Sequence, residues 1–169
     1  MKKILLIVLS VLTLNATNFR VGMNTENYQD CEGGSISILY KYNEKLNFET
    51  SYHEFYIRGV QKGNTTENWN SFNTQRFGIR YYLKSYANDE IKLFTSIGLE
   101  HIYKNDELSS NTPKLNTYGL VGVDFKIDEK FNITFAFGSS GKGEIADKLE
   151  TDPNYAHGFN SVIGIEYNF

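Results

Sequence analysis

Apolar and polar residues alternate with a period of two along most of this 169-residue chain. The closing stretch "GIEYNF" shows the pattern, since Ile165, Tyr167 and Phe169 are separated by single polar residues. A period of two is typical of β-strands with one apolar face, whereas a helix requires a period of 3.6. The pattern predicts eight strands, at residues 18–24, 34–42, 46–57, 73–84, 91–103, 117–127, 131–139 and 157–169.

The expected connections are alternately short and long. Three are tight turns, at 43–45, 85–90 and 128–130, and four are longer, at 25–33, 58–72, 104–116 and 140–156. Both prolines, Pro113 and Pro153, lie in long connections, where they remove no sheet hydrogen bond. This alternation is typical of an up-and-down antiparallel barrel in an outer membrane. The predicted fold is therefore all-β, a closed eight-stranded transmembrane barrel.

The tight turns also predict the register of three hairpins. Centring each turn on its middle residue pairs Ile36 with Tyr52, Ile79 with Ile97, and Val123 with Phe135. Each pairing puts apolar residues on one shared face, and a slip by one residue would destroy that agreement.

Two features indicate that the apolar face points outward. Aromatic residues gather at the strand ends next to the short turns, as a membrane-interface girdle requires: Tyr42, Phe48, Tyr81, Phe125, Phe131, Tyr167 and Phe169. Glycines gather on the polar face, where small residues suit the narrow interior of an eight-stranded barrel: Gly78, Gly98, Gly122, Gly138 and Gly164. The rival interpretation is a soluble, lipocalin-like barrel with its apolar face inside.

With the polar face inside, its charged residues fill the lumen. Buried charges must be paired and hydrogen-bonded. We therefore expect a network of ion pairs there, with Arg76 opposite Glu100. The expected members of the network are Lys41, Glu49, Arg76, Arg80, Glu100, Asp124 and Glu166.

The first 16 residues have the pattern of a secretory signal peptide. Lys2 and Lys3 precede an apolar run from Ile4 to Leu14 that is too short to span a bilayer, and Ala16 is the expected cleavage point. Residues 17–169 then form the barrel domain. Without the two lysines the formal charge is −5, which argues against a nucleic-acid partner. One cysteine, Cys31, excludes an internal disulfide.

The alternating strands, the loop asymmetry, the leader and the closing "IEYNF" together resemble the small outer-membrane β-barrels of Gram-negative bacteria, of the OmpA-domain and OmpX type. The resemblance covers the whole mature chain. It implies a location in the outer membrane, in contact with membrane lipid and lipopolysaccharide. It also implies that the barrel-assembly machinery reads the alternating C-terminal positions, here Ile163, Ile165, Tyr167 and Phe169.

Known barrels of this size include lipid A deacylases, which resemble this chain but carry a His-x-Ser-Asn motif near the seventh strand. The corresponding stretch here, "FAFGSSGKG", contains Ser139 and Ser140 but no histidine to activate them. No group of histidines, cysteines or carboxylates has metal-ligand spacing. We therefore expect no catalytic residues, no metal and no cofactor, and lipid A hydrolysis is the least favoured activity.

The expected role is structural or interactional, through four long external loops and a filled lumen, with an unidentified surface partner. Trp69 and Phe72, in the expected 58–72 loop, are the candidate contact residues. The alternative is a narrow pore for small solutes, which a continuous plug of paired charges would exclude.

Overall fold

The computed structural model describes residues 18–28, 31–110, 114–140, 147–150 and 159–169. The expected signal peptide lies outside this described part of the chain. Eight strands run in sequence order: β1 (Phe19–Tyr28), β2 (Cys31–Lys41), β3 (Leu46–Val60), β4 (Glu67–Tyr86), β5 (Ile91–Ile102), β6 (Lys114–Lys126), β7 (Phe131–Ser140) and β8 (Phe159–Asn168). No helix among the described residues is long and apolar enough to cross a membrane.

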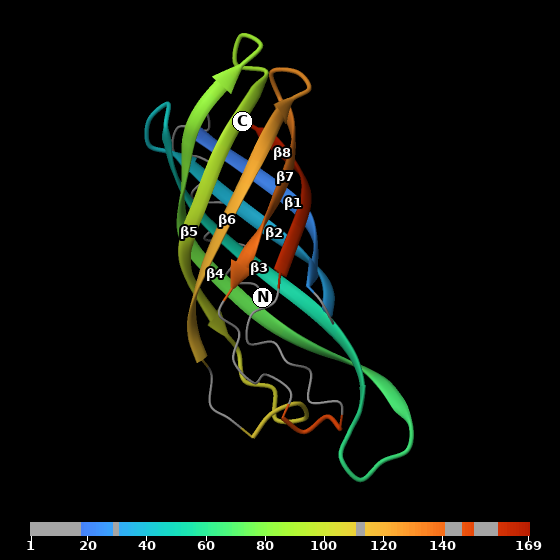
Figure 1. Ribbon diagram of the computed structural model, residues 1–169. Helices are drawn as coiled ribbons and strands as arrows, with labels where there is room; N and C mark the ends of the chain where they lie inside the picture. The colour runs from blue at the N-terminus through green and yellow to red at the C-terminus, as the bar shows by residue number, and fades with distance from the viewer. Residues whose placement is uncertain (1–17, 29–30, 111–113, 141–146, 151–158) are drawn as a thin grey trace.

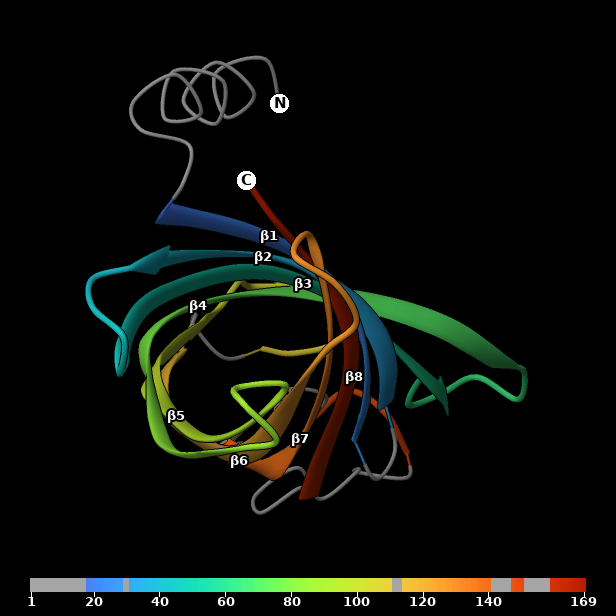
Figure 2. The ribbon, with the colours of Figure 1, turned by 90° about the horizontal axis from the view of Figure 1, so that it is seen from above.

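Each strand pairs antiparallel with its neighbours in the chain, and β1 pairs with β8 to close the ring. Figure 1 shows the strands side by side around the barrel, and Figure 2 looks down on the closed ring. The predicted closed, eight-stranded antiparallel barrel is therefore confirmed.

The predicted registers are confirmed in all three hairpins. Ile36 pairs with Tyr52, Ile79 with Ile97, and Val123 with Phe135. The β4–β5 hairpin shifts its register between Tyr82 and Lys84, which places one extra residue in β4 just before its turn. In that turn Ala87, Asn88 and Asp89 adopt φ angles of 50°, 55° and 69°. The extra residue changes the register only between the bulge and the turn. The pairs on the other side of the bulge, from Thr74–Ile102 to Tyr82–Phe94, keep the predicted register.

Two of the four predicted long loops are wrong. The β1 and β2 strands continue to Tyr28 and Cys31, so only residues 29–30 lie between them, not the expected 25–33. Likewise β3 and β4 pair as far as Val60 and Glu67, so most of the expected 58–72 loop is a hairpin that extends beyond the barrel wall (Figure 1). These extensions carry polar residues on both faces, and so give no apolar alternation by which to recognise them.

The apolar set faces outward and the polar set faces inward. Apolar side chains of the barrel wall are half exposed, as for Ile36 at 57% and Phe77 at 53%, whereas Glu100 and Glu166 are fully buried. An aromatic girdle follows the short-turn end, with Phe131 and Tyr167 rings 5.2 Å apart and Tyr167 and Phe169 rings 5.0 Å apart. The apolar-interior alternative is therefore excluded, and the outer face suits hydrocarbon.

Glycines on the inner face let neighbouring strands and side chains approach closely. A Cβ atom added to Gly98 would lie 2.2 Å from the Phe77 carbonyl oxygen and 2.8 Å from the Tyr118 ring. Gly119, on the outer face, has nothing closer than an Ile97 methyl group at 4.0 Å. The inner wall at Gly98 therefore has no room for a methyl group.

We predict that Gly98→Ala lowers the free energy of unfolding by about 1–3 kcal/mol, because the added methyl group overpacks the wall. Gly119→Ala is the matched control and should change it by less than about 1 kcal/mol. Urea unfolding in micelles, followed by circular dichroism, measures both. Equal effects at the two positions would contradict the close approach at Gly98.

Candidate functional site

The lumen is the place where the fold gathers polar chemistry, because every second residue of each strand points into it. Its charged side chains form two ion-pair networks, one nearer the short turns and one nearer the long connections. We call them the turn-side network and the loop-side network.

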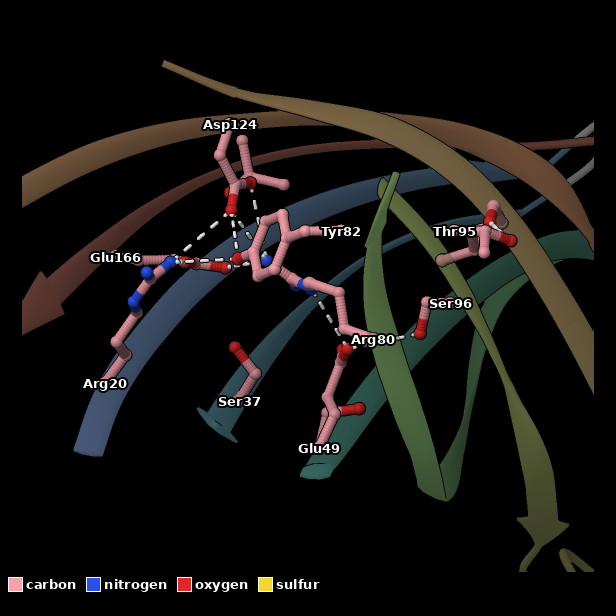
Figure 3. Close-up of polar contacts among 12 residues, drawn as sticks. Arg20, Ser37, Glu49, Arg80, Tyr82, Thr95, Ser96, Asp124 and Glu166 are labelled. Atoms are coloured by element: carbon pink, nitrogen blue, oxygen red, sulfur yellow. Dashed lines mark hydrogen bonds and ion pairs between the residues drawn. The ribbon is translucent and has the colours of Figure 1, made fainter. Parts of the chain in front are cut away.

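The turn-side network is organised around Arg80 of β4, which contacts three carboxylates from three other strands. Arg80 Nη1 lies 2.7 Å from Glu166 Oε1 and 3.4 Å from Asp124 Oδ1. Arg80 Nε lies 3.3 Å from Glu49 Oε2. Arg20 of β1 supplies a second cation, 3.2 Å from Glu166 Oε2 and 3.4 Å from Asp124 Oδ2. Figure 3 shows these groups converging across the barrel.

Neutral donors complete the turn-side network. The Tyr82 hydroxyl donates to Asp124 Oδ2 at 2.6 Å, and Thr134 Oγ1 donates to Asp124 Oδ1 at 2.7 Å. Ser96 Oγ donates to Glu49 Oε2 at 3.2 Å (Figure 3). These bonds satisfy carboxylate oxygens that the two arginines alone leave partly unbonded, as burial in a narrow lumen requires.

The loop-side network is organised around Arg76, which lies on the same inner face of β4, four residues before Arg80. Arg76 Nε lies 3.0 Å from Glu100 Oε1, and Arg76 Nη1 lies 2.9 Å from Glu26 Oε2. His53 Nδ1 lies 2.7 Å from the other oxygen of Glu26. Ser35, Thr74 and Asn160 donate further hydrogen bonds to these two carboxylates: Ser35 and Asn160 to Glu26, and Thr74 to Glu100.

Ser51, His53 and Glu26 stand in the order nucleophile, base and acid. Ser51 Oγ lies 2.6 Å from His53 Nε2, and the opposite ring nitrogen faces Glu26. All three are at least 95% buried, and the Phe55 ring stacks on the histidine with centroids 5.7 Å apart. A packed, buried serine offers no face to a substrate, so this contact supports a structural role, in which Ser51 satisfies the second ring nitrogen.

An apolar cluster closes the lumen beyond the loop-side network. Phe55 and Phe72 stack with centroids 5.4 Å apart. Leu108 and Leu149, from the connections after β5 and β7, are fully buried against them. The other buried members are Cys31, Ile57 and Ile102.

The connections that carry this cap are bound to each other. The amide and hydroxyl of Ser110 donate to the Asp147 carboxylate at 2.9 and 2.8 Å, and these bonds lower the pKa of Asp147. Lys62 N donates to Lys148 O at 2.8 Å, and Glu150 N donates to Val60 O at 2.7 Å, so residues 148–150 add to the edge of β3.

The structure brings together six of the seven residues expected in the lumen network. Glu49, Arg80, Asp124 and Glu166 share the turn-side network, and Arg76 and Glu100 share the loop-side network. Lys41 lies apart, because its Nζ pairs with Glu44 Oε1 in the β2–β3 turn at 2.6 Å.

Sequence reasoning missed Arg20, Glu26 and Tyr82 as members of the networks. Arg20 and Glu26 lie on β1, whose few apolar residues left its register unassigned and its second half in an expected loop. The signal that identifies them is their β1 register, since Arg20, Gly22, Asn24 and Glu26 pair with inward residues of β2.

Of the two candidate contact residues, Trp69 is exposed and Phe72 is buried. Trp69 is 58% exposed on the extended β3–β4 hairpin, whereas Phe72 is 2% exposed inside the apolar cap. Phe72 is therefore corrected to a packing residue, because it points to the same side of β4 as the inward Thr74. In the described part of the chain no group of three or more His, Cys, Asp or Glu residues is placed to hold a metal ion.

No family model matches the sequence, and no curated protein matches it. Solved structures do match. Neisserial surface protein A is 12% identical, with a TM-score of 0.64, over 90% of this chain and 97% of that one. The N-terminal barrel domain of Pseudomonas aeruginosa OprF is 16% identical, with a TM-score of 0.55, over 89% and 96% of the two chains.

A third similar structure is Ail, the attachment invasion locus protein of Yersinia pestis. It is 13% identical, with a TM-score of 0.52, over 89% of this chain and 96% of that one. At these identities the likeness concerns the fold. The chain has the fold of the small eight-stranded outer-membrane β-barrels.

We predict that Arg80→Met lowers the free energy of unfolding by about 3–5 kcal/mol, because it leaves three buried carboxylates short of a cation. Arg58→Met is the matched control. Its partner Glu67 lies 2.9 Å away, but both side chains are about half exposed, so the loss should stay below about 1 kcal/mol. Urea titrations in micelles compare the two. A small effect at Arg80 would contradict its place at the centre of the turn-side network.

Proposed function

We propose that the protein spans a bacterial outer membrane as a structural or surface-interaction barrel that does not conduct solutes. The observation that carries the proposal is the filled lumen. Two ion-pair networks and an apolar cap follow one another along the barrel, and their central side chains are at least 94% buried. A solute would have to break several buried, charge-assisted hydrogen bonds to pass.

The orientation follows from the two ends of the barrel. The short turns, the start of β1 and the end of β8 lie at one end of the barrel. We place this end on the periplasmic side. The extended β3–β4 hairpin and the capped connections then face outward. Lipopolysaccharide and the outer-membrane lipids surround the apolar wall, and Ile163, Ile165, Tyr167 and Phe169 serve the barrel-assembly machinery.

Surface contact is assigned to the β3–β4 hairpin. It extends beyond the other strands (Figure 1), and Trp69 is exposed beside the Arg58–Glu67 ion pair. A rigid aromatic residue with charged neighbours is a common anchor in protein interfaces. Ail, whose name refers to attachment, has the same fold and supports an interactional role.

Heat-modifiability of the outer-membrane fraction tests the membrane barrel. We expect the unboiled protein to migrate differently from the boiled protein on SDS gels, because a closed barrel exposes no unpaired strand edge to detergent. A protein recovered from the periplasm with no shift would overturn the proposal.

Planar-bilayer recording tests the filled lumen. The refolded wild type should give no discrete current steps. Steady single-channel steps would instead support the narrow pore, and the same recording on Gly119→Ala controls for currents caused by refolding alone.

A further inference from the structure

Two adjoining hollows mark the outer face of the barrel across β8, β1, β2 and β3. The first measures about 690 Å³ and the second about 530 Å³. Both are lined by Thr25, Gly34, Tyr56 and Ile163, so they form one continuous groove. The strands that form it lie side by side in the barrel wall (Figure 1).

The groove exists because small residues stand in the middle of a row of larger ones. Strand pairing sets Ile163, Thr25, Gly34 and Glu54 in one row across the four strands. Gly34 has no side chain, and a Cβ atom built there would meet only the Asn24 carbonyl oxygen, at 3.5 Å. The backbone at Gly34 is thus the floor, and the side chains on both flanks are the walls.

The groove is apolar at one end and polar at the other. The row nearer the short turns is Ile165, Met23, Ile36 and Tyr52, and each of these side chains is at least 49% exposed. The row nearer the loops is Ser161, Asn27, Glu32 and Tyr56. The apolar end is continuous with the apolar outer wall, and the polar end lies toward the loops.

The charge at the polar end is negative. Glu32 lines one hollow and Glu54 the other, and Tyr56 borders both. Among the described residues that line the groove there is neither lysine nor arginine. A carboxylate on the lipid-facing side of a barrel costs free energy unless a cation or hydrogen-bond donor pairs with it. The groove at Glu54 is therefore a candidate site for a cationic group.

We propose that this groove binds one membrane lipid with an ammonium head group in the loop-side leaflet, for which phosphatidylethanolamine is the probe. One acyl chain extends from the floor at Gly34 past the apolar row toward the short turns, and the ammonium group donates a charge-assisted hydrogen bond to Glu54. The polarity of the groove matches that orientation, because the head group of a loop-side lipid points toward the loops. The proposal rests on the membrane location proposed above.

Native mass spectrometry of the refolded protein tests the groove. The wild type is incubated with equal amounts of phosphatidylethanolamine and phosphatidylglycerol that carry the same acyl chains. We expect one retained phosphatidylethanolamine, preferred about tenfold, the ratio that one hydrogen bond to a charged group supplies. Gly34→Leu fills the floor and should abolish retention. Gly119→Leu, at an open outward glycine on β6, should leave it unchanged.

The variant Glu54→Gln distinguishes recognition of the lipid head group from binding of the acyl chain. This variant should still retain a lipid but lose the preference for phosphatidylethanolamine. Equal retention by wild type and Gly34→Leu, a preference for the anionic lipid, or a dimer mass in place of a lipid adduct would each overturn the groove proposal. The gel shift is measured on the same samples. A wild type without a shift would contradict the membrane barrel itself, whereas a shift without lipid selectivity contradicts the groove alone.

Discussion

The pairing of β1 with β8 is the constraint on which the rest of the structure depends. In hydrocarbon every backbone N–H and C=O group must find its partner within the protein, and a sheet satisfies this condition only when it closes. Closure at eight strands leaves a lumen just wide enough for side chains. Closure of the ring in hydrocarbon therefore constrains both faces of the sheet. The outer face must be apolar, and the side chains of the inner face must pack against one another.

Burying charged side chains in a narrow lumen costs free energy unless each charge is paired. In this protein the charges are paired in two successive layers, the turn-side network and the loop-side network. The two arginines of β4, four residues apart, each bind carboxylates contributed by other strands. Each guanidinium also lies over an aromatic ring, Arg76 over Tyr118 at 5.1 Å and Arg80 over Phe94 at 4.4 Å. These rings belong to a cluster of buried, mostly apolar residues on the inner wall, beside the charges. The strands are thus connected through the lumen as well as along the wall.

The strands, their order and their register were predictable because a barrel with an apolar outer face and a polar inner face imposes a period of two that single residues rarely break. Ile36 opposite Tyr52 and Val123 opposite Phe135 required nothing beyond the turn lengths. The prediction failed where the apolar outer wall ends. Beyond it β1 through β4 continue as polar ribbon, so the alternation carries no hydrophobic signal, and Glu26 and Phe72 were placed in loops. Which charged side chains pair in the lumen depends on how far each one extends across the barrel. Strand register alone does not give this information.

The position of Trp69 has a spectroscopic consequence. The chain contains one tryptophan, and it stands on the β3–β4 hairpin, outside the barrel wall. Its emission therefore reports on the water, lipid or protein that surrounds the hairpin, while the far-ultraviolet signal of the strands reports on the barrel. One sample thus carries two separate optical reporters, and the surface of the protein can be followed without a label while the barrel stays folded.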